Sequence, residues 1–137
     1  MTINHFSNIL VVDDSSTVRG VVRKLLSQLG YRSIDEAPDG AAALSKITAS
    51  HFDLVISDWI MEPMSGHDLL ERVRANEKLA NLSFIMMTAD ATIDRIVKAR
   101  NAGVNCFINK PFSAEGLQEK ILRINSELSL GRTRLTA

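Results

Sequence analysis

The sequence predicts an α/β fold in which five βα units form a doubly wound, five-stranded parallel sheet. Short apolar segments alternate with longer segments of helical periodicity, which is the rhythm of βα units. Several of the short segments are apolar at nearly every position, as is typical of strands covered by helices on both faces. Charged or hydroxyl side chains follow directly where these segments end.

The predicted strands are the five short apolar segments. They lie near residues 7–12, 32–37, 53–57, 83–88 and 104–109.

The predicted helices alternate with the strands. Over residues 16–29, apolar side chains recur every three or four positions, and Gly30 follows as a stop signal. Further helices are expected after Asp39-Gly40, after Ser65-Gly66, over residues 91–101, and from the N-cap candidate Ser113 to about Leu128.

Size and charge limit the function classes. A chain of 137 residues forms one domain of ordinary size, assigned to residues 1–128. The tail over 129–137 is too short for an output domain, and we expect its Arg132 and Arg134 to be solvated and disordered. The formal net charge is +0, so the chain lacks the basic surface of a nucleic-acid binder.

The compartment predicted from the sequence is the cytoplasm. Cys106 is the only cysteine, which excludes an internal disulfide and is compatible with a reducing cytosol. No apolar stretch approaches the length of a membrane span, and residues 1–5 do not begin a secretory signal. We therefore expect no membrane partner.

Three carboxylates stand where predicted strands end. Asp13 and Asp14 follow the first strand, and Asp58 follows the third. The carboxyl ends of parallel strands share one edge, so these side chains are expected to converge there and to need a hard cation such as Mg²⁺. Two simpler interpretations remain open: Asp14 caps the first helix, or Asp58 is an ordinary turn residue.

Two further residues complete a phosphoryl-transfer set. Thr88 ends the fourth strand and Lys110 follows the fifth, so both are expected near Asp58. A carboxylate can attack phosphorus when a metal offsets the incoming charge, while an ammonium and a hydroxyl bind the phosphoryl oxygens. Alone, such a lysine is usually solvated and such a threonine bonds local backbone.

The order and spacing of four segments resemble the response regulator receiver domain, in its single-domain, CheY-like type. The segments are Leu10–Asp14, Asp58–Gly66, Met87–Ala89 and Asn109–Phe112.

The resemblance implies a flavodoxin-like sheet with strand order 2-1-3-4-5, and Asp58 as phosphoacceptor. It also implies Mg²⁺, with Mn²⁺ as a substitute, held directly by Asp14 and Asp58, through water by Asp13, and by the main-chain carbonyl of Ile60. Thr88 and Lys110 would contact the phosphoryl group.

The chain departs from the family pattern at two places. Ile60 stands where relatives often carry Asn, and we hypothesise that its apolar side chain slows hydrolysis of the acyl phosphate. The usual Met-Pro is replaced by Met61-Glu62-Pro63, which leaves the local backbone open. The resemblance also implies a cis bond between Lys110 and Pro111.

Phe107 occupies the family's switch-aromatic position, and with Ile96 and Lys120 it matches the usual partner-binding face. Phe107 and Ile96 could equally be core residues. Trp59, the only tryptophan, is expected to be a partly exposed neighbour of the site and an optical reporter.

The predicted function is a stand-alone receiver, a signalling switch and not a metabolic enzyme. It would take phosphate from a sensor histidine kinase or a histidine phosphotransfer protein and then bind a downstream protein, plausibly in chemotaxis-like signalling. The alternatives are a phosphorelay shuttle or phosphate sink, a phosphatase with an aspartyl nucleophile, and a phosphorylation-independent interaction module. A monomer is expected, with a dimer through the fourth and fifth helices as an alternative.

Overall fold

A computed structural model describes residues 2–130 and contains one five-stranded parallel sheet in the order β2-β1-β3-β4-β5. The predicted fold class and strand order are confirmed. The strands are β1 (Asn8–Val12), β2 (Ser33–Ala37), β3 (Leu54–Asp58), β4 (Ser83–Thr88) and β5 (Cys106–Asn109).

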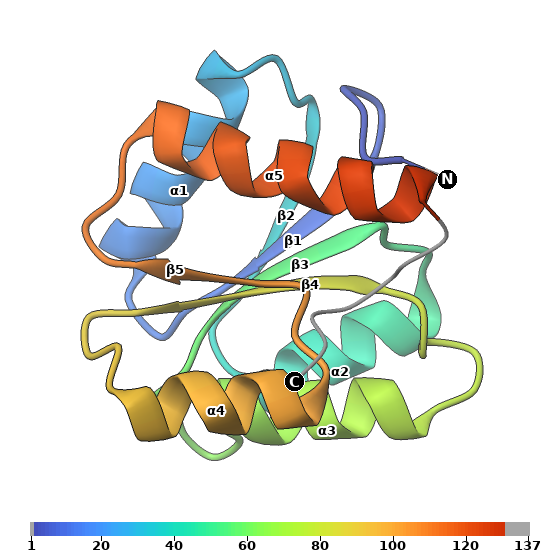
Figure 1. The fold of residues 1–137 in the computed structure, drawn as a ribbon, viewed down its shortest axis with the longest axis vertical. Helices are drawn as coiled ribbons and strands as arrows, with labels where there is room; N and C mark the ends of the chain where they lie inside the picture. Colours follow the sequence, from blue (N-terminus) through green and yellow to red (C-terminus); the bar gives the residue numbers. More distant parts are fainter. Residues whose placement is uncertain (1, 131–137) are drawn as a thin grey trace.

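Helices cover both faces of the sheet. Figure 1 shows α1 and α5 on one face and α2, α3 and α4 on the other. The helices are α1 (Ser16–Gln28), α2 (Gly40–Ala49), α3 (Gly66–Ala75), α4 (Ile93–Ala102) and α5 (Ala114–Ser129). Among residues 2–130, no helix is long and apolar enough to cross a membrane.

Alternation along the central strands divides the core into two layers. In β1, Ile9 and Val11 belong to the layer under α1 and α5, whereas Leu10 and Val12 belong to the layer under the other three helices. All four are 0% exposed. Each such side chain stabilises the fold by about 1.5–3 kcal/mol, so the strand register is strongly fixed.

Each helix begins with a side-chain cap. The hydroxyl or carboxylate of the N-cap residue accepts a hydrogen bond from a backbone N–H of the first turn. The N-caps are Ser15, Asp39, Ser65, Thr92 and Ser113. The interpretation of Asp14 as the cap of the first helix is therefore wrong, because Ser15 fills that position and leaves Asp14 available.

Most boundaries differ from the sequence prediction by one or two residues. β5 begins at Cys106, two residues later than predicted. Just before it, the Asn105 side-chain oxygen accepts hydrogen bonds from Phe84 N and Arg74 Nη2. α4 begins at Ile93 because Thr92 is its cap. α5 continues to Ser129, into the predicted tail, whose Arg132 and Arg134 lie outside the described residues.

The backbone folds back tightly after β3. Gly66 N donates to the carbonyl of Trp59 at 2.8 Å. A Cβ added to Gly66 would lie 2.0 Å from the carbonyl oxygen of Asp58 and 3.0 Å from Ser57 Oγ. Only glycine fits where α3 begins, and its close approach fixes the end of the strand that carries Asp58.

Gly66→Ala is expected to destabilise the protein by about 3 kcal/mol, because the new methyl group must displace backbone and not a flexible side chain. Urea denaturation would measure the free energy of unfolding. The matched control is Gly20→Ala in α1, where a Cβ meets nothing within 4 Å. That variant should be about 0.5–1 kcal/mol more stable than the parent. Equal effects of the two substitutions would contradict this account.

Candidate functional site

Three carboxylates meet at the carboxyl edge of the sheet, as predicted. Asp13 follows β1, Asp58 ends β3, and these two strands are paired neighbours. One carboxylate oxygen from each of Asp13, Asp14 and Asp58 lies within 4.8 Å of the others. We call these three residues the acid cluster. Asp13 is buried, Asp58 half-buried and Asp14 exposed, so the cluster opens to solvent on one side.

Lys110 joins two members of the acid cluster. Its Nζ lies 2.8 Å from Asp13 Oδ2 and 3.1 Å from Asp58 Oδ1. The lysine is positioned by its backbone, since Lys110 N donates to the carbonyl of Thr88 at 2.8 Å. The Lys110–Pro111 bond is cis, as the family resemblance implied, and so is Glu62–Pro63.

Asp13 is held from several sides. Its Oδ1 accepts from Ser15 N at 2.9 Å, while its Oδ2 accepts from Lys110. The carbonyl of Asp13 accepts from Arg19 Nη1 at 2.7 Å. This carboxylate is 1% exposed and has a partner on each oxygen, so its position is fixed by the fold.

The surroundings raise the pKa of both Asp58 and Lys110. Burial raises the pKa of the Asp58 carboxyl; Lys110 opposes this rise and the negative charge of Asp13 adds to it. Burial alone would lower the pKa of Lys110, but its hydrogen bonds and ion pairs with Asp13 and Asp58 outweigh burial and raise it. Lys110 is thus held as an ammonium, and burial makes ionisation of Asp58 less favourable than in water.

The donor set fits a hard divalent cation. Three ionised carboxylates and one ammonium leave two negative charges, and all the donor atoms are oxygen, which Mg²⁺ and Mn²⁺ prefer. Asp13, Asp14 and Asp58 would hold such an ion. Ile60 lies in the loop two residues beyond Asp58, and its main-chain carbonyl as a further ligand stays a prediction.

Thr88 lies at the end of β4, beside the strand that carries Asp58, and is 2% exposed. Its hydroxyl oxygen accepts from Asp90 N at 3.1 Å and from Arg95 Nη1 at 3.3 Å. Both donors lie on the α4 side and not in the acid cluster. Thr88 ends its strand as the sequence predicted, and its hydroxyl accepts a hydrogen bond from an arginine that the sequence pattern does not reveal.

Residues 9–122 match the response regulator receiver domain family. The chain belongs to this family. It is 47% identical over 116 residues to a chemotaxis protein CheY of Pseudomonas aeruginosa, covering 85% of this chain and 94% of the relative. It is 44% identical over 126 residues to chemotaxis protein CheY-3 of Vibrio cholerae, covering 92% and 97%.

Solved structures agree with the family assignment. The chemotaxis protein CheY4 of Vibrio cholerae superposes with a TM-score of 0.81 at 29% identity, covering 87% of this chain and 98% of that one. A CheY-like receiver domain protein of Methanospirillum hungatei gives a TM-score of 0.82 at 28% identity, covering 92% and 98%. The receiver fold thus extends over nearly the whole chain.

Trp59 is a half-buried neighbour of the receiver's acid cluster, as predicted. Its ring stacks on His67 with centroids 5.3 Å apart and meets Phe107 edge-on at 6.3 Å. The Arg95 guanidinium lies 5.6 Å from the Trp59 ring centroid, within the range of a cation–π contact. The only tryptophan therefore contacts α3, α4 and β5 at once, directly after Asp58.

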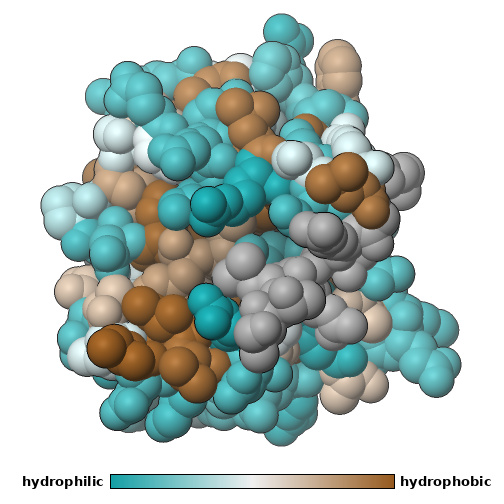
Figure 2. Space-filling view, viewed as in Figure 1, coloured by the Kyte–Doolittle hydropathy of each residue, from teal (hydrophilic) through white to brown (hydrophobic). Residues whose placement is uncertain are grey.

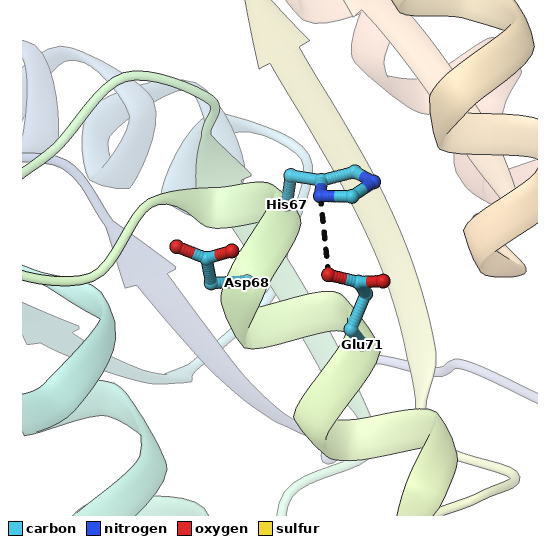
Figure 3. A group of neighbouring side chains, drawn as sticks. All are labelled: His67, Asp68 and Glu71. Carbon is cyan, nitrogen blue, oxygen red and sulfur yellow. Dashed lines mark ion pairs between the residues drawn. The ribbon is translucent and has the colours of Figure 1, made fainter.

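A second group of potential metal ligands lies on α3 of the receiver. His67, Asp68 and Glu71 each offer a ligand atom within 4.8 Å of the others. Figure 3 shows His67 and Glu71 one helical turn apart, with His67 Nδ1 paired to Glu71 Oε1 at 3.4 Å. Asp68 and Glu71 are exposed, and an ordinary i,i+4 pair on a helix surface explains this arrangement.

The predicted partner face of the receiver is partly apolar. Phe107, Ile96 and Lys120 are all half-buried, so each contributes to the surface as well as to packing. On α4, Ile93 is 81% exposed and Val97 is 45% exposed. Figure 2 shows hydrophobic residues gathered at the lower left, over the region of α4. Burying such side chains against another surface is favourable.

Lys110→Met is expected to bind Mg²⁺ roughly tenfold more tightly than the parent at low salt, because the ammonium beside two of the proposed ligands opposes an incoming cation. A MgCl₂ titration followed by Trp59 fluorescence would measure the dissociation constant. The control Lys120→Met removes the same charge from α5 and should bind as the parent does. Unchanged or weaker binding by Lys110→Met would contradict the proposed competition.

Proposed function

We propose that this receiver is a stand-alone phosphorylation switch. Asp58 accepts a phosphoryl group from a phosphohistidine of a sensor kinase or phosphotransfer protein in a Mg²⁺-dependent reaction. The observation that carries the proposal is the placement of Lys110 Nζ between the Asp13 and Asp58 carboxylates, at 2.8 and 3.1 Å. A phosphoryl group on Asp58 would therefore form beside a protonated amine.

The proposed reaction is an in-line displacement. An Asp58 carboxylate oxygen attacks phosphorus, the P–N bond of the phosphohistidine breaks, and the electron pair returns to the imidazole nitrogen. A bound Mg²⁺ ion supplies charge neutralisation for the phosphoryl oxygens. Lys110 exchanges its contact with the Asp58 oxygen for one with a phosphoryl oxygen, and the Thr88 hydroxyl donates a hydrogen bond to another.

The charge balance of the site favours this exchange. Burial disfavours the ionised form of Asp58 and raises its pKa, and phosphorylation removes the carboxylate charge from that half-buried position. The new charge lies farther out, on phosphoryl oxygens that Lys110 and the metal can reach. Asp13 keeps its own contacts with Ser15 N and Lys110, so the rest of the cluster need not rearrange.

Phosphorylation is proposed to shift an equilibrium of the surface formed by α4, β5 and α5. Phe107, Ile96 and Lys120 would carry the change to a partner protein. The 47% and 44% identities to chemotaxis proteins of two bacteria make chemotaxis-like signalling the favoured setting. A phosphorelay shuttle or phosphate sink uses the same chemistry without an output partner, and would bind no target in either phosphorylation state.

The first test is intact-protein mass after incubation with acetyl phosphate, with and without Mg²⁺. We expect one phosphoryl adduct that requires Mg²⁺ and is absent from Asp58→Ala, because a single carboxylate is the acceptor. Asp68→Ala, an exposed aspartate at the start of α3, is the matched control and should be phosphorylated as the parent is.

A folded parent protein that forms no adduct, with acetyl phosphate or a phosphohistidine donor, would contradict the proposal and favour a phosphorylation-independent interaction module. Turnover of many phosphomonoester molecules per protein would instead indicate a phosphatase. Capture of a partner with and without beryllofluoride, a stable mimic of the acyl phosphate, separates a switch from a shuttle.

Ile60→Asn is expected to lose phosphate roughly tenfold faster than the parent, a barrier lower by about 1.4 kcal/mol. The Ile60 side chain is 59% exposed in the loop beside Asp58, where an amide could hydrogen-bond the attacking water and an alkyl group cannot. Decay of the adduct after removal of acetyl phosphate would measure this rate. Ile60→Val, which keeps an apolar side chain, should decay at the parent rate; equal rates for all three would contradict the hypothesis.

A further inference from the structure

Arg95 connects the phosphorylation site to α4 through two contacts of one side chain. Its Nη1 donates to Thr88 Oγ1 at 3.3 Å, and its guanidinium carbon lies 5.6 Å from the centroid of the Trp59 ring. Thr88 belongs to β4 and Trp59 to the loop after β3. A residue of the first turn of α4 therefore contacts both the end of β4 and the residue that directly follows Asp58.

The position of Arg95 in its helix is electrostatically unfavourable. The N-cap of α4 is Thr92, so Arg95 stands in the first turn, where the helix dipole favours anions and disfavours cations. The neighbouring Asp94 is the acidic residue that suits this position. The Arg95 side chain instead reaches across to Thr88 and Trp59.

Two donors fix the position of the Thr88 hydroxyl oxygen, while its O–H stays available to donate. In this structure its oxygen is directed to Arg95 and to the backbone N–H of Asp90. In the proposed function, the same hydroxyl donates to a phosphoryl oxygen on Asp58, which requires the Thr88 side chain to turn toward Asp58. Turning toward the phosphoryl group lengthens a contact with Arg95 that is already 3.3 Å, near the limit of a hydrogen bond.

We propose that Arg95 is a positioning residue that restrains Thr88 in its resting orientation and ties release of Thr88 to the first turn of α4. This inference rests on the proposed function. When Thr88 turns to the phosphoryl group, α4 loses its tether to β4, while the guanidinium can stay on the Trp59 ring. The exposed Ile93 and the half-buried Ile96 flank Arg95 within three residues of sequence, so release of the tether bears directly on the apolar face of α4.

A restraint that exists only in the resting state lowers the apparent affinity for an activating ligand. Arg95→Ala should therefore bind beryllofluoride, in the presence of Mg²⁺, more tightly than the parent by roughly threefold to tenfold, as loss of one hydrogen bond of ordinary strength implies. The midpoint of a titration followed by Trp59 fluorescence would measure the affinity. Arg95→Lys retains a charged donor and should lie nearer to the parent than Arg95→Ala does.

Two controls separate the restraint from other effects. Arg100→Ala removes an exposed arginine from the last turn of the same helix and should bind as the parent does. In a Thr88→Val background, Arg95→Ala should change the affinity no further, because the shared hydrogen bond is already absent. If Arg95→Ala still increased the affinity for beryllofluoride in the Thr88→Val background, the proposal would be overturned. Unchanged or weaker binding by Arg95→Ala alone would overturn it as well.

Failure of the restraint is distinguishable from failure of the proposed function. A parent protein that takes up beryllofluoride, and forms the Asp58 adduct with acetyl phosphate, keeps the proposed function even where Arg95→Ala matches it. If the parent protein neither binds beryllofluoride nor forms the adduct, the proposed function is overturned, and the proposed restraint with it.

Discussion

The arrangement of the site depends on the repulsion among three carboxylates at one edge of the sheet. Parallel strands bring Asp13 and Asp58 side by side, and Asp14 adds a third carboxylate within 4.8 Å. Like charges at such distances repel strongly where water is partly excluded. Lys110 offsets part of this repulsion by contacting Asp13 and Asp58, and the remaining negative charge favours binding of the proposed Mg²⁺.

Backbone geometry at the end of β3 makes that edge rigid. Trp59 N donates to the carbonyl of Met87 at 3.2 Å, and Gly66 N donates to the carbonyl of Trp59. The Ser57 hydroxyl donates to the Asp58 carbonyl at 2.9 Å. Asp58 is therefore held by main-chain contacts on both sides, whereas its carboxylate faces the cluster. The Asp58 carboxylate can therefore change its contacts without movement of β3.

The sequence predicted the strands and the convergence of the acid cluster because both follow from short-range patterns. Apolar runs define buried strands, and polar residues at their ends must share an edge in a parallel sheet. The sequence did not predict that Ser15 caps α1 or that the Asn105 side chain accepts from Phe84 N. Both depend on which of several nearby polar side chains accepts a given backbone hydrogen bond. The contact of Arg95 with Thr88 depends on a rotamer across a loop, which no periodicity reveals.

The two sides of Thr88 explain how a small change of charge could reach the surface. On one side lie fixed groups: the Lys110 backbone, which bonds the Thr88 carbonyl, and the Asp58 strand. On the other side lies α4, joined through Arg95 and bearing exposed apolar side chains. Phe107 lacks a phenolic hydroxyl, so its turning cannot exchange a hydrogen bond. In the proposed switch, the contribution of Phe107 is therefore carried by shape and apolar contact, which suits a protein partner that buries the α4 side chains.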